Sequence, residues 1–206
     1  MIKKPNFIIC NEDLKLLLWL PHKTGTRTVQ FIFNHFDFKT VIENTQDKTK
    51  LTHNYITGIN TTDLPDNHLD YQLISTMRNP YSRFISYHFF SNKLNPKKQI
   101  DLYDYNSSIG RISKFLDIEP MAFGKRTPDF FIKTESMLED VLQFDFIQQS
   151  KLYQCGVLQD LVSKKFNSTS YNENWKNYYN RELADQVYNL FKHIFDLNIY
   201  DKDSWK

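Results

Sequence analysis

A short segment rich in lysine, threonine and glycine follows an apolar run near the N-terminus of the chain. The run covers residues 16–20, and the segment consists of Lys23, Thr24, Gly25, Thr26, Arg27 and Thr28. Apolar side chains then recur every three or four positions, which predicts a helix over residues 26–36. A strand that leads through a turn into a helix directs several backbone N–H groups and the positive end of the helix dipole towards one point. The segment therefore predicts an anion-binding loop, with the ammonium group of Lys23 beside the anion.

The residue types of this segment suit contact with an anion. Gly25 permits a tight turn and close approach of a ligand. The three threonines can donate hydroxyl groups, and Arg27 offers a second cation. The lysine precedes the glycine, so the segment differs from the Walker A motif. Taken alone, it is equally typical of an ordinary helix N-terminus with a solvated lysine and arginine.

A second strand-to-helix transition carries an arginine and a serine. Residues 71–77 have the composition of a buried strand, and Arg78 follows directly. Asn79 and Pro80 provide a helix N-cap and a proline at the first helical position, which places Ser86 within the helix. If the two strands are parallel neighbours, both transitions lie at one edge of the sheet. A ligand bound by both transitions would carry two separate anionic groups. The ordinary alternatives are that Arg78 forms a surface ion pair and that Ser86 is a helical serine with no partner.

The order of elements predicts the fold class. Further strands are predicted over residues 7–10, 15–20 and 130–134, and further helices over residues 53–59, 107–116, 136–142 and 182–195. This alternation, in a chain of 206 residues, predicts one domain over residues 1–206. The expected architecture is a three-layer, P-loop-like α/β sandwich with a central, mainly parallel sheet flanked by helices.

Composition argues against several classes of protein. The net charge of +2 is too small for the basic face of a nucleic-acid-binding protein. The chain has no run of 18 apolar residues and no evident signal peptide, so neither a membrane partner nor export is expected. Cys10 and Cys155 are far apart in the sequence, which predicts two buried or partly buried free thiols in a reducing, cytoplasmic compartment. The histidines lack metal-ligand spacing, so no metal is predicted.

Two motifs, in this order, resemble those of sulfotransferases that use 3′-phosphoadenosine 5′-phosphosulfate (PAPS). Residues 21–26, PHKTGT, look like the loop of that family that binds the 5′-phosphosulfate. Residues 77–87, MRNPYSRFISY, resemble the 3′-phosphate motif R-[DN]-P-x-x-R-x-x-S-x-Y. Residues 131–140 and 167–200 are similar to later segments of the family, the last one to carbohydrate sulfotransferases. The resemblance spans nearly the whole chain, with one departure at His22, which separates the proline from the lysine.

The resemblance implies an enzyme that transfers the sulfuryl group of PAPS to an acceptor hydroxyl, on a carbohydrate, and releases 3′-phosphoadenosine 5′-phosphate (PAP). Lys23 would stabilise the leaving phosphate, assisted by backbone donors from residues 24–28, while Arg78 and Ser86 would bind the 3′-phosphate. The leading candidate for the general base is His53, with Glu43 and His22 as alternatives. No metal cofactor is implied.

Two other functions stay open at this point. A P-loop-type kinase of nucleotides or small molecules would share the fold, but the Walker A order is missing and residues 71–77 lead into Arg78 instead of a Walker B aspartate. A non-catalytic nucleotide-binding module would have no need of Lys23 or His53, and both are present. The expected partners are PAPS and a hydroxylated acceptor, with no nucleic acid and no membrane. The sequence does not indicate an oligomeric state.

Overall fold

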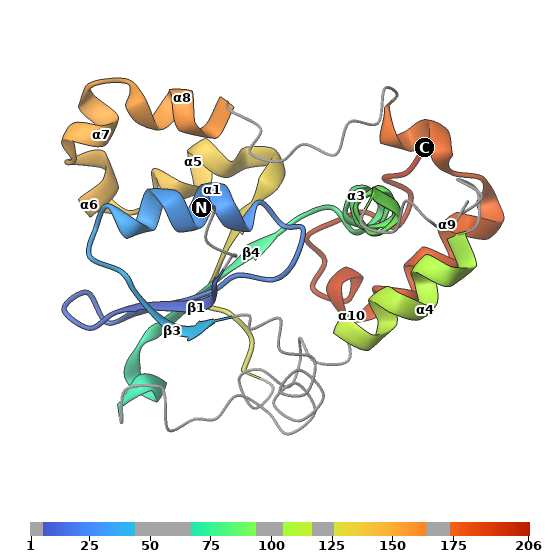
Figure 1. Ribbon diagram of the computed structural model, residues 1–206, viewed down its shortest axis with the longest axis horizontal. Helices are drawn as coiled ribbons and strands as arrows, with labels where there is room; N and C mark the ends of the chain where they lie inside the picture. Colours follow the sequence, from blue (N-terminus) through green and yellow to red (C-terminus); the bar gives the residue numbers. More distant parts are fainter. Residues whose placement is uncertain (1–5, 44–66, 94–104, 117–125, 164–173) are drawn as a thin grey trace. The chain divides into compact units, whose positions relative to one another are not determined.

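A computed structural model describes residues 6–43, 67–93, 105–116, 126–163 and 174–206 of the chain (Figure 1). The chain divides into two compact units, each built from two separate parts of the sequence. The first unit comprises residues 1–77 and 120–166, and the second comprises residues 78–119 and 167–206. The chain therefore passes from the first unit to the second between Met77 and Arg78. One domain over residues 1–206 remains a prediction.

The first unit contains a sheet with the strand order β3-β1-β2-β4-β5. Its strands are β1 (Asn6–Asn11), β2 (Leu16–Trp19), β3 (Lys39–Glu43), β4 (Gln72–Met77) and β5 (Phe130–Lys133). Strand β1 is antiparallel to both of its neighbours, whereas β2 pairs with β4 and β4 with β5 in parallel. Four strands thus run in one direction and β1 runs against them. The sheet is mixed and mostly parallel, which confirms the predicted α/β class; β3 was not predicted.

The central strands explain the apolar runs of the sequence. All four residues of β2 are buried, and so are the last five residues of β4. A strand in the middle of a sheet can be buried at successive positions instead of alternate ones. The buried residues of β2 are all apolar, whereas those of β4 include the polar residues Ser75 and Thr76. The parallel register pairs Leu16 with Gln72 and Trp19 with Ser75. The carboxyl ends of β2 and β4 consequently lie at the same edge of the sheet.

The described helices of the first unit lie on one face of its sheet (Figure 1). They are α1 (Thr26–Asn34), α5 (Met137–Val141), α6 (Asp145–Gln148), α7 (Lys151–Gln154) and α8 (Val157–Ser163), with the short 3-10 helices η2 (His68–Asp70) and η4 (Thr134–Ser136) near strand ends. Val29, Ile32 and Phe33 of α1 are fully buried in one core with strand residues such as Leu18 and Ile74. The spacing of these α1 residues confirms the predicted amphipathic helix. Helices on the other face of the sheet remain a prediction.

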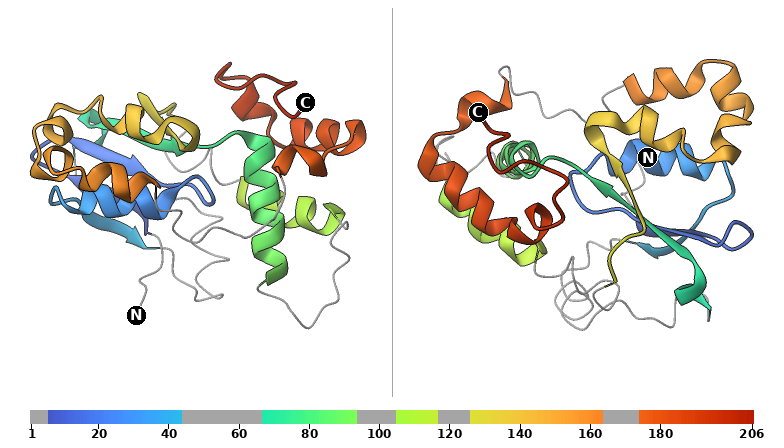
Figure 2. Two further views of the ribbon diagram at one scale, coloured as in Figure 1. Left: turned by 90° about the horizontal axis from the view of Figure 1, so that it is seen from above. Right: turned by 180° about the vertical axis from the view of Figure 1, so that it is seen from behind.

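The second unit consists of helices around an aromatic core. Figure 2 shows α3, in green, together with the shorter helices of this unit. The elements are α3 (Pro80–Lys93), α4 (Tyr105–Leu116), η5 (Trp175–Tyr178), α9 (Arg181–Leu190) and α10 (Lys192–Phe195). The continuous helix predicted over residues 182–195 is wrong in one respect, because it divides at Phe191, whose φ of −104° and ψ of 20° leave the helical range. The Phe191 side chain is fully buried in the core, with the Arg83 guanidinium 5.6 Å from its ring.

Two further predictions bear on the described residues. None of the helices in the described part of the chain combines the length and the apolar character needed to cross a bilayer. Cys10 and Cys155 are both free, as predicted. The predicted burial is confirmed for Cys10 but is wrong for Cys155, which is exposed. A cytoplasmic location remains a prediction.

Candidate functional site

The predicted anion-binding loop connects β2 to α1. Strand β2 ends at Trp19, and α1 begins at Thr26 with Gly25 as its N-cap residue. The loop thus starts at the carboxyl end of a strand that has a parallel neighbour, the position at which α/β sheets commonly bind ligands. The local fold agrees with the sequence-based prediction of strand, turn and helix.

Two residues of the loop adopt a left-handed backbone conformation. The φ angle is 67° at Lys23 and 78° at Gly25. This conformation costs a lysine about 1–2 kcal/mol but costs glycine nothing. A Cβ atom at Gly25 would lie 2.5 Å from Cε of Met137 and 3.4 Å from Oγ1 of Thr134. Backbone conformation and close packing against the β5–α5 connection therefore both favour glycine.

Buried threonine hydroxyls hold the loop in shape. The carbonyl oxygen of Pro21 accepts hydrogen bonds from Oγ1 of Thr24 (2.7 Å) and from Oγ1 of Thr26 (2.6 Å). The Thr24 hydroxyl also lies 2.5 Å from the hydroxyl of Thr76 on β4. Because the single hydrogen of Thr24 is directed to Pro21, Thr76 is the donor in this pair. Thr24 and Thr26 therefore stabilise the loop from inside, a role that the sequence prediction of ligand-donating hydroxyls had not included.

The backbone N–H groups at the start of α1, unlike the threonine hydroxyls, are mostly not used within the loop. The N-cap residue Gly25 has no side chain that could cap this helix, and the first turn contains no acidic residue. The N–H groups of Thr28 and Val29 donate to the carbonyl oxygen of Gly25, at 3.0 and 3.2 Å. Within the described ranges, no acceptor is found for the backbone N–H groups of Thr24, Gly25, Thr26 and Arg27. These four donors and the positive end of the α1 dipole can stabilise an anion at the loop.

The remaining predicted residues of the loop are partly accessible. Lys23 and Arg27 are half-buried, and Thr28 is buried in the first turn of α1. The structure thus brings residues 23–28 together with Thr76 and Thr134 in the first unit. His22, one of the alternative bases, is half-buried and immediately precedes Lys23.

The arginine motif belongs to the second unit. Arg78 directly follows β4, and its Nε donates to Oγ of Ser82 over 2.8 Å. The Ser82 hydroxyl in turn donates to the carbonyl oxygen of Asn79 (3.1 Å). Ser86 is buried one turn further along α3. Arg78, Ser82 and Ser86 are spaced by four residues; the prediction missed Ser82, although this spacing places it on the same helix face.

Asn79 caps α3 as predicted. Its Oδ1 accepts hydrogen bonds from the backbone N–H groups of Tyr81 (3.0 Å) and Ser82 (3.4 Å), and Pro80 is the first helical residue. This arrangement is typical of an asparagine N-cap. The first donors of α3 are therefore used within the protein, in contrast to those of α1.

The side chains of two candidate general bases lie outside the described part of the structure. His53 lies outside the described residues, as does the predicted helix over residues 53–59. Glu43 is the last residue of β3, and its side chain is also outside the described part. Assignment of the general base to His53, Glu43 or His22 remains a prediction.

Searches for metal ligands and for related proteins add no further assignment. Within the described ranges, no group of three or more histidine, cysteine, aspartate or glutamate residues could hold a metal ion. No protein-family model, no curated protein and no solved structure matches the chain.

Replacing Gly25 by alanine should lower the free energy of unfolding by about 1–2 kcal/mol, because alanine is strained at a φ of 78°. Gly110, within α4, is the matched control, since a Cβ there would meet no atom within 4 Å. Gly110→Ala should stabilise the protein by up to about 1 kcal/mol through helix propensity. Urea unfolding measures both changes. Equal effects of the two substitutions would contradict the assigned backbone conformation.

Thr24→Val should destabilise the protein by about 1–3 kcal/mol, because it removes the hydroxyl shared by Pro21 and Thr76 and leaves buried polar groups unsatisfied. Thr28→Val serves as control: it is the same substitution at a buried site of the same segment, where the hydroxyl has no hydrogen bond to any described residue. The control should change the free energy of unfolding by less than about 0.5 kcal/mol. Similar losses in both variants would refute the internal role of Thr24.

Proposed function

We propose that the chain is a sulfotransferase that moves the sulfuryl group of PAPS to an acceptor hydroxyl, on a carbohydrate. One observation carries the proposal: the hydroxyls of Thr24 and Thr26 are directed to Pro21, while the N–H groups of residues 24–27 have no acceptor among the described residues. A rigid loop with unused donors at a helix N-terminus suits a phosphate or sulfate group. The resemblance of residues 21–26 and 77–87 to the two PAPS motifs selects sulfuryl transfer among the reactions that such a loop could serve.

The proposed reaction is an in-line displacement at sulfur. The acceptor oxygen forms a bond to sulfur as the bond between sulfur and the bridging oxygen of the 5′-phosphate breaks. The electron pair of that bond stays on the departing phosphate, and the proton of the acceptor hydroxyl passes to the general base. Lys23 and the loop N–H groups stabilise the negative charge that develops on the leaving oxygen. His53 is the candidate base, with Glu43 and His22 as alternatives.

Arg78 and Ser86 bind the 3′-phosphate in this proposal. An arginine guanidinium presents several donors in one plane and binds phosphate oxygens with charge-assisted hydrogen bonds. The hydrogen bond from Nε of Arg78 to Ser82 supports this role, because it fixes one edge of the guanidinium. Because Asn79 occupies the N–H groups of Tyr81 and Ser82, the proposal assigns the attraction of the 3′-phosphate to the charge of Arg78.

The proposed function also implies an architecture, a location and partners for the protein. We expect a P-loop-like sandwich of three layers, in one domain over residues 1–206, that acts in the cytoplasm without a metal cofactor. Its partners are PAPS and a hydroxylated acceptor, and neither nucleic acid nor a membrane is involved. The mostly parallel sheet and the loop at the carboxyl end of β2 support the expected sandwich.

A P-loop-type kinase is the second candidate, because unused N–H donors at the start of α1 would also suit the phosphates of ATP. Two features favour sulfuryl transfer over it. Lys23 precedes Gly25 instead of following the glycine-rich turn, and β4 is followed by Arg78 where a kinase of this class would use a metal-binding aspartate. A module that binds PAP without catalysis would share the nucleotide contacts but not the turnover.

The nucleotide preference tests the proposal directly. Titration calorimetry should show PAP binding at least about tenfold more tightly than AMP, because Arg78 and Ser86 contact a phosphate that AMP lacks. ATP should compete poorly with PAP. Equal affinities for PAP and AMP, or a clear preference for ATP, would contradict the proposal and favour the kinase.

Replacing Lys23 by alanine should reduce turnover by about 10²–10³-fold, measured as PAP formed from PAPS with a panel of glycans, while the affinity for PAP falls less than tenfold. Lys15→Ala is the matched control, since Lys15 also has a positive φ (51°) but is exposed in the turn after β1. It should leave turnover unchanged. Unchanged turnover in Lys23→Ala would contradict the catalytic role of Lys23.

The base assignment has its own test. Full activity of His53→Ala would show that His53 is not the general base and would leave Glu43 or His22 for that role.

A further inference from the structure

The C-terminal segment, residues 201–206, contacts the first turn of α3 within the second unit. Nδ2 of Asn79 donates to Oγ of Ser204 over 2.9 Å, and the hydroxyl of Tyr81 donates to the carbonyl oxygen of Lys202 over 2.6 Å. Asn79 and Tyr81 are 8% and 1% exposed. Both contacts join residues more than 120 positions apart in the sequence. The segment therefore contributes tertiary contacts to the helix start that follows Arg78.

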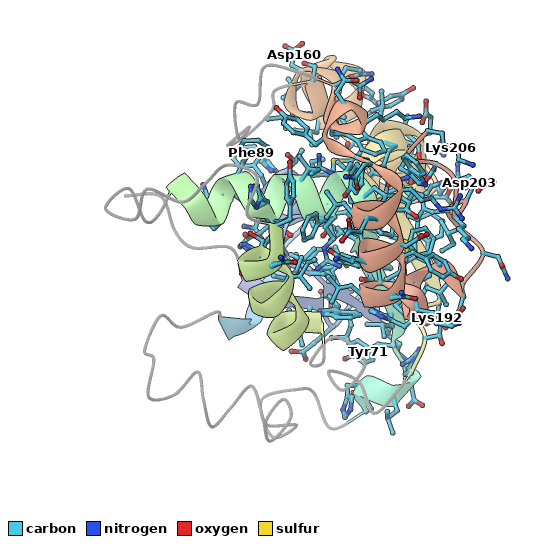
Figure 3. All side chains as sticks on the ribbon, turned by 90° about the vertical axis from the view of Figure 1, so that its right-hand side faces the viewer. Tyr71, Phe89, Asp160, Lys192, Asp203 and Lys206 are labelled. Carbon is cyan, nitrogen blue, oxygen red and sulfur yellow. The ribbon has the colours of Figure 1, made fainter. Side chains whose placement is uncertain are left out.

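The segment has its own internal structure. The backbone N–H of Ser204 donates to the carbonyl oxygen of Asp201 (3.1 Å), and that of Lys206 donates to Asp203 (3.0 Å). The side chains of Asp203 and Lys206 lie 3.0 Å apart, side by side at the surface in Figure 3. Nζ of Lys176, from η5, donates to the carbonyl oxygen of Lys206. These contacts fix the conformation in which Ser204 reaches Asn79.

Tyr81 is held firmly on its other side. Its carbonyl oxygen accepts a hydrogen bond from the Tyr179 hydroxyl (2.8 Å), and the two rings meet edge to face with centroids 5.2 Å apart. The ring of Phe195 lies 5.3 Å away. Burial raises the pKa of Tyr81 to about 12, so its hydroxyl stays protonated at neutral pH and donates to Lys202.

A chain of hydrogen bonds leads from this segment to the arginine. Ser204 accepts from Asn79, whose Oδ1 accepts from the N–H of Ser82, and whose carbonyl oxygen accepts from the Ser82 hydroxyl. The Ser82 oxygen then accepts from Nε of Arg78. Loss of the Ser204 hydroxyl would therefore remove a hydrogen bond from Asn79. Because Asn79 positions the Ser82 hydroxyl, the group that accepts from Arg78 would shift as well.

We propose that residues 201–206 position Arg78 for the 3′-phosphate, with Ser204 and Tyr81 as positioning residues that do not touch the ligand. This inference rests on the proposed function and extends it to the selectivity for a 3′-phosphorylated nucleotide. An arginine that is oriented before binding loses less side-chain freedom when a phosphate arrives. Release of the C-terminal segment should weaken binding of the 3′-phosphate and leave the contribution of the remaining nucleotide unchanged.

The test compares PAP with AMP, since the two nucleotides differ only in the 3′-phosphate. The double variant Tyr81→Phe/Ser204→Ala removes both hydrogen bonds and keeps the buried ring. Its affinity for PAP should fall about three- to tenfold, with its affinity for AMP unchanged within about twofold. Ser204→Ala alone, at a half-buried position, should produce part of the loss even if the double variant folds poorly. Ser204→Thr keeps the hydroxyl and should restore wild-type selectivity.

Ser163→Ala is the matched control, because it removes an exposed hydroxyl whose hydrogen bond, among the described residues, goes to Asp160 within α8. It should leave the PAP-to-AMP ratio unchanged. An unaltered ratio in the double variant and in Ser204→Ala, with a selective wild type, would overturn the positioning role and leave the proposed function intact. An equal loss of PAP and AMP affinity would show that the segment only stabilises the fold, and would also overturn the positioning role. A wild type that does not distinguish PAP from AMP would remove the proposed function and this inference together.

Discussion

The carbonyl oxygen of Pro21 is the acceptor on which the conformation of the loop between β2 and α1 depends. It accepts two hydrogen bonds, from the hydroxyls of Thr24 and Thr26, which flank the N-cap residue Gly25. The loop is tied to β4 as well, through the Thr24–Thr76 pair. Together these bonds can offset the left-handed conformation of Lys23, which costs about 1–2 kcal/mol. The N–H groups of residues 24–27 have no acceptor among the described residues, which in the proposed function makes them available to an anion. The backbone of the lysine is held at a fixed point of the turn.

The chain uses its two strand-to-helix transitions in different ways. At α1 the helix N-terminus has no side-chain cap, so the backbone itself offers charge to a ligand. At α3 the Asn79 side chain occupies the first donors, and the positive charge comes from Arg78, held by Ser82. The first arrangement suits a group that changes charge during reaction, because fixed dipoles need no reorganisation. The second suits a group that is only bound, which agrees with the proposed roles of the 5′-phosphosulfate and the 3′-phosphate.

Most elements could be predicted because their signals are local. The apolar run of β2, the spacing of Val29 and Phe33 in α1, and the Asn-Pro start of α3 each depend on neighbouring residues. The short helices α6 and α7 could not be predicted, since four-residue helices are stable only through tertiary packing. Phe144 and Phe146 at α6 pack against Phe33 and Phe36, and Leu152 and Tyr153 of α7 pack against the same core. Edge strand β3 likewise depends on pairing with β1. The residues of the loop were identified, but not the direction of the Thr24 hydroxyl, because its partner Thr76 lies 52 positions away.

The central claim is that this loop serves sulfuryl transfer and not phosphoryl transfer. The most direct measurement incubates the protein with PAPS radiolabelled at sulfur, in parallel with ATP radiolabelled at the γ-phosphate, each with the same panel of glycans. The account predicts label on a glycan from PAPS, with one PAP formed per sulfate transferred, and no transfer from ATP. Label transferred from ATP alone, or no transfer from PAPS to any hydroxylated acceptor, would contradict it.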